Sequence, residues 1–348
     1  MSPDARAFIC GCKGLELDAD ERAFLAAWHP WGFILFRRNI DTPAQTAALV
    51  ASFREIVGRA DAPVLVDQEG GRVQRLGPPH WPRYPAAARF SGVAGADFEG
   101  RVDIARVSAR LMAADLAELG INVDCLPVLD VPAPGGHNVI GDRAYAADPA
   151  GVATFGRAVA EGLMQGGVLP VMKHVPGHGR AGADSHLELP VVHASRESLE
   201  SIDFAPFRAL ADLPMAMTAH VVYTALDPAR PATISPVVVR EVIRGAIGFD
   251  GLLMSDDMSM KALAGSFAEK AAATFAAGVD VALHCNGDLS EAIEVARVSP
   301  VLDGRPAERA GRALARLASP VKEFDPVDAR ARVELALAAP AWNASLSS

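Results

Sequence analysis

The stretch "VLPVMKH", residues 168–174, shows the pattern that decides the fold of this chain. Its apolar residues follow one another without alternation, and the run then ends in Lys173 and His174. A strand that is apolar on both faces is typical of a parallel sheet covered by helices on either side. Seven further runs have a similar form: residues 6–12, 32–36, 62–67, 121–130, 214–220, 251–256 and 279–285.

Segments with helical periodicity lie between these runs. Residues 41–58 open with Asp-Thr-Pro, residues 148–167 with Asp-Pro and residues 235–248 with Ser-Pro, and all three end in Gly. Eight such units in succession predict an α/β protein with a (β/α)8 TIM-type barrel. We expect a single domain over residues 1–348, with 305–340 as C-terminal closing helices. A doubly wound open sheet is the alternative, but the first βα turn lacks G-x-G-x-x-G.

The composition narrows the classes of function. The 348 residues include 33 Lys and Arg against 42 Asp and Glu, and the net charge of -9 argues against a nucleic-acid partner. No apolar run reaches about 18 residues, the length that suggests a membrane span. The N-terminal sequence "MSPDARAFICGCKG" lacks the features of a signal peptide. We therefore expect a cytoplasmic protein with no nucleic-acid, membrane or protein partner.

The cysteines fit a reducing compartment. All four lie in strand-like runs, at Cys10, Cys12, Cys125 and Cys285, and are most simply core residues. Cys10 and Cys12 would share one face of a strand, so a metal ion bound by this pair is the alternative.

Polar residues stand at the end of most of the predicted strands. In a (β/α)8 barrel the carboxyl ends of the strands and the loops after them meet at one mouth, which holds the active site. Any one of these residues is explained equally well as a helix cap or a buried hydrogen-bonding group, but the whole set is not. The strand ends carry Asp67, Asp130, Lys173, His174, His220, Asp256 and His284, and the loops add Arg75, Arg143, His178, Asp184 and His186.

A mouth rich in histidine suggests two kinds of hydrolase. A metal-dependent hydrolase would use His and carboxylate ligands, but it normally has a tight His-x-His pair on the first strand, where this chain has "CGCKG". Several of the histidines also stand beside Gly, whereas metal ligands are usually braced. We therefore expect no metal and no cofactor, and we keep the metal-dependent barrel hydrolase as the alternative.

A glycosidase is the second kind. Retaining hydrolysis needs a carboxylate nucleophile and a second group that first donates and then accepts a proton. Because side chains alternate along a strand, we expect one of Asp256 and Asp257 to face the mouth and the other to cap the following helix. In "DSH", Asp184 and His186 would lie on the same side of an extended segment, where the carboxylate orients the imidazole for acid and base catalysis.

Six motifs give this chain a resemblance to a known family. They are "DQEGGRVQR" (67–75), "IGDRAY" (140–145), "KHVPGHG" (173–179), "DSH" (184–186), "MTAHVVY" (217–223) and "MSDDMSM" (254–260). In this order they resemble the family 3 glycoside hydrolases, and within them the single-domain bacterial β-N-acetylglucosaminidases of peptidoglycan recycling. The likeness extends from about residue 15 to about residue 290.

The resemblance implies a role for each matching residue. It implies Asp256 as the nucleophile, His186 as the proton donor and acceptor, and Asp184 as the partner of His186. It also implies that the hydroxyls of N-acetylglucosamine are held by Asp67, Arg75, Arg143, Lys173 and His174. Such charged groups make strong hydrogen bonds to hydroxyls and fix the position of the ring.

The same resemblance implies the reaction. It is the exo-acting, retaining removal of terminal N-acetylglucosamine from N-acetylglucosaminyl-anhydro-muropeptides, through a covalent glycosyl-aspartate. A non-catalytic sugar-binding barrel is a further alternative, but it would be expected to lack the nucleophile. Val175 and Arg180 stand where the family often has an aromatic and an acidic residue. We assign His178, His220 and His284 to supporting or structural positions, and name Glu69 and Glu188 as proton donors if His186 has no such role.

Overall fold

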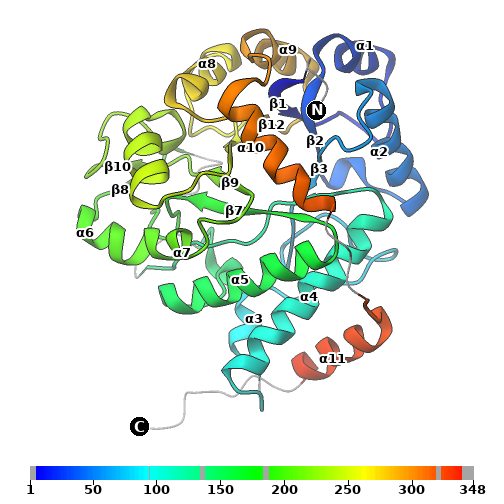
Figure 1. Cartoon of the computed structure of the whole chain (residues 1–348), viewed down its shortest axis with the longest axis vertical. Helices are drawn as coiled ribbons and strands as arrows, with labels where there is room; N and C mark the ends of the chain where they lie inside the picture. Colours follow the sequence, from blue (N-terminus) through cyan, green and yellow to red (C-terminus); the bar gives the residue numbers. More distant parts are fainter. Residues whose placement is uncertain (1–4, 94, 134–137, 183–187, 319–322, 339–348) are drawn as a thin grey trace.

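Eight parallel strands close into a barrel in the order in which the chain presents them (Figure 1). The computed structural model describes residues 5–93, 95–133, 138–182, 188–318 and 323–338. Strand β12 pairs with β1 to close the barrel, so the predicted (β/α)8 fold is confirmed and the open-sheet alternative is wrong. The strands are β1 (Arg6–Cys10), β2 (Pro30–Leu35), β3 (Val64–Val66), β6 (Val123–Asp124), β7 (Leu169–Val175), β9 (Met215–Thr218), β11 (Leu252–Asp257) and β12 (Val281–His284).

A helical segment follows each barrel strand. The ends of these segments follow the expected signals. In helix α2 (Pro43–Val57) the side chain of the N-cap Thr42 accepts a hydrogen bond from Gln45 N, and Gly58 ends the helix with a φ of 64°. The segment 235–248 differs from an ordinary α-helix, because it forms the π-helix η5 (Val238–Ala246). The others are α1 (Ala19–Trp28), α2 (Pro43–Val57), α4 (Phe98–Glu118), α5 (Pro149–Gln165), α7 (Phe204–Ala209), α8 (Phe267–Ala277) and α9 (Leu289–Val298).

The inside of the barrel is filled with apolar side chains. Ile9, Leu65, Val171 and Leu252 belong to one buried cluster, and Ala313 of helix α10 (Gly304–Ala315) belongs to the same cluster. Helix α10, orange in Figure 1, therefore covers the amino ends of the strands and leaves the carboxyl ends for the site.

The last described helix, α11 (Pro326–Ala338), packs against α4, and Arg332 forms an ion pair of 2.9 Å with Asp103. Within the described ranges, no helix is long and apolar enough to cross a membrane.

All four cysteines are buried and carry free thiols. Burial raises the pKa of Cys12 to about 12, and burial likewise raises the pKa of Cys10. Over the described part of the chain, no three His, Cys, Asp or Glu side chains gather in a way that could hold a metal ion.

Candidate active site

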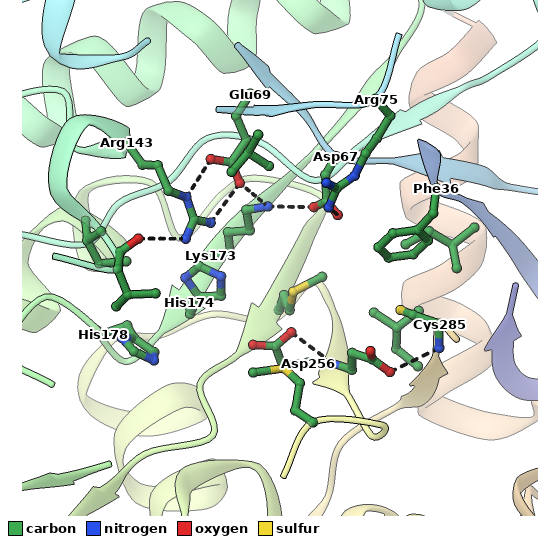
Figure 2. Close-up of a pocket in the computed structure, with 18 residues that line it drawn as sticks. Phe36, Asp67, Glu69, Arg75, Arg143, Lys173, His174, His178, Asp256 and Cys285 are labelled. Carbon is green, nitrogen blue, oxygen red and sulfur yellow. Dashed lines mark hydrogen bonds and ion pairs between the residues drawn. The ribbon is translucent and has the colours of Figure 1, made fainter. Parts of the chain in front are cut away.

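A cavity of about 130 Å³ opens at the carboxyl ends of the strands (Figure 2). Six of the eight residues to which the family resemblance assigns a role line it: Asp67, Arg75, Arg143, Lys173, His174 and Asp256. The other two nominated residues, Asp184 and His186, lie outside the described residues.

A short hairpin after β3 delivers part of the cavity wall. Strands β4 (Gln68–Gly70) and β5 (Val73–Gln74) pair antiparallel. The end of β4 needs glycine, because Gly70 has a φ of 87° and a Cβ there would lie 2.2 Å from Pro85 O. The hairpin places the Glu69 and Arg75 side chains at the cavity on either side of Lys173.

Five charged side chains form a row of alternating sign along this side, which we call the ionic wall (Figure 2). Lys173 Nζ lies at its centre, 2.8 Å from Asp67 Oδ1 and 2.7 Å from Glu69 Oε1. At one end Arg75 Nη2 donates to Asp67 Oδ2 at 2.9 Å. At the other end Arg143 holds Glu69 through two bonds of 2.8 Å. The wall therefore presents fixed donors and acceptors to the cavity.

The pairing keeps the wall charged. Burial raises the pKa of the Asp67 carboxyl, but Lys173 and Arg75 outweigh this and hold it well below its ordinary value. The pKa of Glu69 is lowered in the same way, because Lys173 and Arg143 outweigh its burial. An ionised Glu69 has no proton to give near neutral pH, so it does not suit the role of alternative proton donor.

Asp130 organises the two histidines beside the ionic wall. Its Oδ2 lies 2.7 Å from His174 Nδ1, and its Oδ1 accepts from the backbone N of His178 at 2.6 Å. Burial works against ionisation, but His174 outweighs it and the pKa of Asp130 falls to about 2. The Asp130 carboxylate accepts from Nδ1, so the Nε2 side of the His174 ring is left to face the cavity.

His178 lines the cavity as well, whereas the sequence assigned it to a supporting or structural position. Burial and the neighbouring His174 lower the pKa of His178 to about 4, which keeps its ring neutral near pH 7.

Two strands depart from regular register where they reach the cavity. Strand β7 advances from Met172 to Val175 while β9 advances from Ala216 to Thr218. In the same way β11 advances from Met254 to Asp257 while β12 advances only from Val281 to Leu283. The extra residue interrupts the alternation of side chains, as in a β-bulge. Consecutive residues of each strand therefore line the cavity: Lys173 with His174, and Asp256 with Asp257.

Asp256 and Asp257 both line the cavity and form what we call the aspartate wall. Figure 2 shows Asp256 across the cavity from the ionic wall. The expectation that only one of the two aspartates faces the mouth is wrong, because of the irregular register. The Asp257 carboxylate nevertheless has hydrogen-bond donors from the protein: Ser259 N and Cys285 N, each at 3.0 Å, and the Ser259 hydroxyl. It does not cap the following helix α8, whose N-cap is Ser266.

Two further histidines at the ends of the predicted strands, His220 and His284, are fully buried and do not line the cavity. His220 lies behind β11, where its Nε2 is 3.0 Å from Asp257 O. His284 packs against the Phe267 ring and approaches Glu291 at 3.1 Å. Their assignment to supporting or structural positions agrees with these places.

Glu69 and several apolar residues also line the cavity, although the sequence gave Glu69 only as a substitute proton donor and did not single out the apolar ones. Glu69 stands in the first motif, two residues after Asp67, and that spacing in a hairpin is the one signal that indicates it. The apolar lining residues gave no signal, because they look like any core residue: Ile34, Phe36, Val73, Val139, Ile140, Met217, Met260 and Leu283.

The two residues that depart from the family pattern do not line the cavity. Val175 is buried at the end of β7. Arg180 Nε donates to the buried Asp203 at 2.6 Å, and its Nη2 donates to Ser198 Oγ at 3.0 Å. Arg180 therefore packs into the protein and does not line the cavity.

A barrel with fixed hydrogen-bond donors and acceptors on one wall and paired carboxylates on the other has the kind of site that a glycoside hydrolase needs. More narrowly, the chain belongs to glycosyl hydrolase family 3, because residues 11–318 match the N-terminal domain of that family.

Similar proteins agree with this assignment. The chain is 41% identical over 308 residues to a β-hexosaminidase of Methylococcus capsulatus, covering 86% of this chain and 90% of the relative. It is 38% identical to a β-hexosaminidase of Pseudomonas aeruginosa, over 81% of this chain and 83% of that one. Among solved structures, the chain is similar to NagZ from Neisseria gonorrhoeae, crystallised in complex with N-trifluoroacetyl-D-glucosamine. The two share 31% sequence identity and a TM-score of 0.84, over 96% of this chain and 98% of NagZ. The predicted family and the predicted enzyme class are thus confirmed.

Proposed function

We propose that this enzyme is an exo-acting, retaining β-N-acetylglucosaminidase that uses Asp256 as its nucleophile. The observation that carries the proposal is the position of Asp256 in the cavity, across from the ionic wall. A sugar ring bound to that wall would have its reactive carbon directed toward the aspartate wall. Both carboxylates line the cavity: Asp257 accepts hydrogen bonds from Ser259 and Cys285, and Asp256 accepts one from Asp257 N at 2.8 Å.

The ionic wall and His174 suit an uncharged, hydroxyl-rich substrate. Asp67 and Glu69 accept hydrogen bonds, and Lys173, Arg75 and Arg143 donate them, so a hydroxyl finds both kinds of partner. The charges of the wall already satisfy one another, and a neutral sugar leaves no buried charge unpaired. We assign Asp67, Arg75, Arg143, Lys173 and His174 to sugar binding, and add Glu69 as the residue that holds Lys173 and Arg143.

The reaction proceeds in two balanced steps. A carboxylate oxygen of Asp256 forms a bond to the anomeric carbon, the glycosidic bond breaks, and His186 gives its proton to the leaving oxygen. In the second step water attacks the same carbon, His186 takes the proton from that water, and the bond to Asp256 breaks. Asp184 orients the His186 ring in both steps. These two roles rest on the "DSH" motif and on the family resemblance.

The substrate follows from the relatives and the resemblance. The Neisseria gonorrhoeae structure holds N-trifluoroacetyl-D-glucosamine, which supports an N-acylated glucosamine as the bound sugar. We propose the N-acetylglucosaminyl-anhydro-muropeptides released from peptidoglycan, with or without their peptide, as natural substrates. The free thiols of all four cysteines fit the cytoplasmic location that we propose for this reaction.

Release of N-acetylglucosamine from a chromogenic β-glycoside, measured with and without phosphate, tests the proposal. We expect the free sugar as product in both buffers. A sugar phosphate formed in phosphate buffer would change the acceptor from water to phosphate. Absence of turnover, together with binding of the sugar, would instead support a non-catalytic barrel.

A further inference from the structure

A closed chain of hydrogen bonds lies behind the aspartate wall. Asp256 N donates to Thr218 Oγ1 at 3.3 Å, and Thr218 Oγ1 lies 2.7 Å from Thr233 Oγ1. Thr233 Oγ1 lies 2.7 Å from His220 Nδ1, and His220 Nε2 lies 3.0 Å from Asp257 O. The chain thus leaves β11 at the amide of Asp256 and returns to it at the carbonyl of Asp257.

The end of β9 and the helix η4 supply the side chains of this ring. Thr218 ends β9, His220 follows two residues later, and Thr233 belongs to the 3-10 helix η4 (Ala232–Ile234). All three side chains are fully buried. Buried polar groups of this kind are costly unless each one is satisfied, and here each has its partner within the ring.

The carbonyl of Asp257 fixes the direction of every bond. A carbonyl oxygen only accepts, so His220 Nε2 carries a hydrogen and donates it. In the neutral ring Nδ1 then accepts from the Thr233 hydroxyl, Thr233 accepts from the Thr218 hydroxyl, and Thr218 accepts from Asp256 N. Each hydroxyl accepts once within the ring and directs its one hydrogen along it. Thr233 Oγ1 also lies 3.2 Å from Ala219 O, a longer second contact for the same hydrogen than the 2.7 Å to His220 Nδ1.

The charge state of the histidine agrees with this direction. Burial lowers the pKa of His220 below its ordinary value, which favours the neutral ring near pH 7.

We infer that Thr218, Thr233 and His220 form a positioning ring that fixes the backbone of Asp256 and so aims its carboxylate at the anomeric carbon. The inference rests on the proposed role of Asp256. None of the three residues lines the cavity, so they act on the reaction through β11 and not by touching the sugar. The irregular register of β11 at this point makes such a support necessary, because the pairing with β12 alone does not hold the strand in a regular ladder.

His284 provides a matched control within the same barrel. It is as deeply buried as His220 and also ends a barrel strand, but it contacts Phe267 and Glu291. A His284→Phe variant should therefore lose stability without a selective effect on the chemical step.

The experiment compares Thr218→Val, Thr233→Val and His220→Phe with His284→Phe. We expect kcat to fall about 10- to 100-fold in the first three, because small displacements of a reacting group have effects of that size. KM should change less than about threefold, since the ionic wall is untouched. The rate of covalent labelling by a 5-fluoro N-acetylglucosaminyl fluoride should fall in parallel with kcat. Thr218→Ser restores the hydroxyl and should restore most of kcat.

The outcomes separate this inference from the proposed function. If the wild-type label is found on Asp256 but Thr218→Val and His220→Phe are labelled at the wild-type rate, the positioning ring is wrong and the nucleophile stands. A wild-type label on a residue other than Asp256 would overturn the proposed function itself. If His284→Phe loses kcat as the ring variants do, or if Thr218→Ser fails to recover, the losses reflect general instability and the inference is wrong.

Discussion

The ionic wall and the aspartate wall face each other across one cavity but are built on opposite principles. On the ionic wall, residues up to about a hundred positions apart meet so that each charge has a neighbour of opposite sign, as Lys173 does between Asp67 and Glu69. On the aspartate wall two carboxylates come from consecutive residues of one strand and are held mainly through backbone groups. The first arrangement suits binding of a neutral sugar, whereas the second keeps negative charge available for a carbon that becomes positive in the transition state.

The sharpest test of this contrast is the pair Asp256→Asn and Asp257→Asn. We expect the first to lower kcat by about 10⁴-fold or more, because it removes the nucleophile. In a proteolytic digest of wild-type enzyme treated with the fluoro sugar, the adduct should lie on Asp256 within "SDDM". An adduct on Asp257 would exchange the roles of the two residues.

The variant His186→Ala tests the proposed proton donor and acceptor of the reaction. A general acid contributes about 10²- to 10⁴-fold, and we expect a loss of this order on a disaccharide substrate. On a nitrophenyl glycoside the first step should be largely spared and an initial burst should appear, because the leaving group needs no proton and only water attack lacks its base. Steady-state and stopped-flow rates measure both effects. Equal losses on the two substrates would contradict the assignment.

The ionic wall should respond in stability as well as in binding. Glu69→Gln leaves Lys173 and Arg143 with a neutral neighbour, and the free energy of unfolding should fall by about 3 kcal/mol, with a rise in KM. The matched control is Glu161→Gln on α5, where the half-exposed pair with Arg106 is worth less than about 1 kcal/mol. Urea unfolding of both variants measures the difference. Equal effects would mean that the ionic wall is no more than a surface network.

The contribution of Asp130 to the free energy of unfolding should depend on pH. Its folded pKa of about 2 lies below the ordinary value of 3.8, so its contribution to stability is complete above about pH 4 and is lost as the pH falls toward 2. Asp130→Asn should therefore cost about 2 kcal/mol at neutral pH and progressively less in acid. Unfolding curves from pH 7 to pH 2 measure this. The control variant is Asp303→Asn, at an exposed position. If the free energy of unfolding of Asp130→Asn differs from that of the wild type by the same amount from pH 7 to pH 2, the expectation is refuted.

Removal of metal should have the smallest effect. Exhaustive chelation followed by an assay should leave the activity unchanged, because neither wall needs a metal ion in the proposed reaction. Loss of activity that zinc restores would revive the metal-dependent hydrolase.

The fold was predictable from the sequence, because strands buried on both faces must be apolar throughout and the helices between them carry clear caps. The hairpin β4–β5 was not, since its strands are only three and two residues long. Asp67, Lys173 and Asp256 were also predictable, because each one stands at the end of a predicted barrel strand. The place of Glu69 was not predictable, because it depends on Lys173, far away in the chain, reaching between two carboxylates. The joint exposure of Asp256 and Asp257 was missed because alternation fails where the register is irregular.

The extra residues in β7 and β11 also bear on how this enzyme tolerates change in chain length. A regular strand offers one inward position for every two residues, whereas each of these strands offers two in a row at the rim. Deleting one residue from β11 would restore the ladder and turn one of the two aspartates away from the sugar, even though every other side chain of the strand could remain apolar and well packed. Substitutions should thus be easier to accommodate at these strand ends than single-residue insertions or deletions, and homologous sequences aligned one position out of step here would exchange the proposed nucleophile with its neighbour.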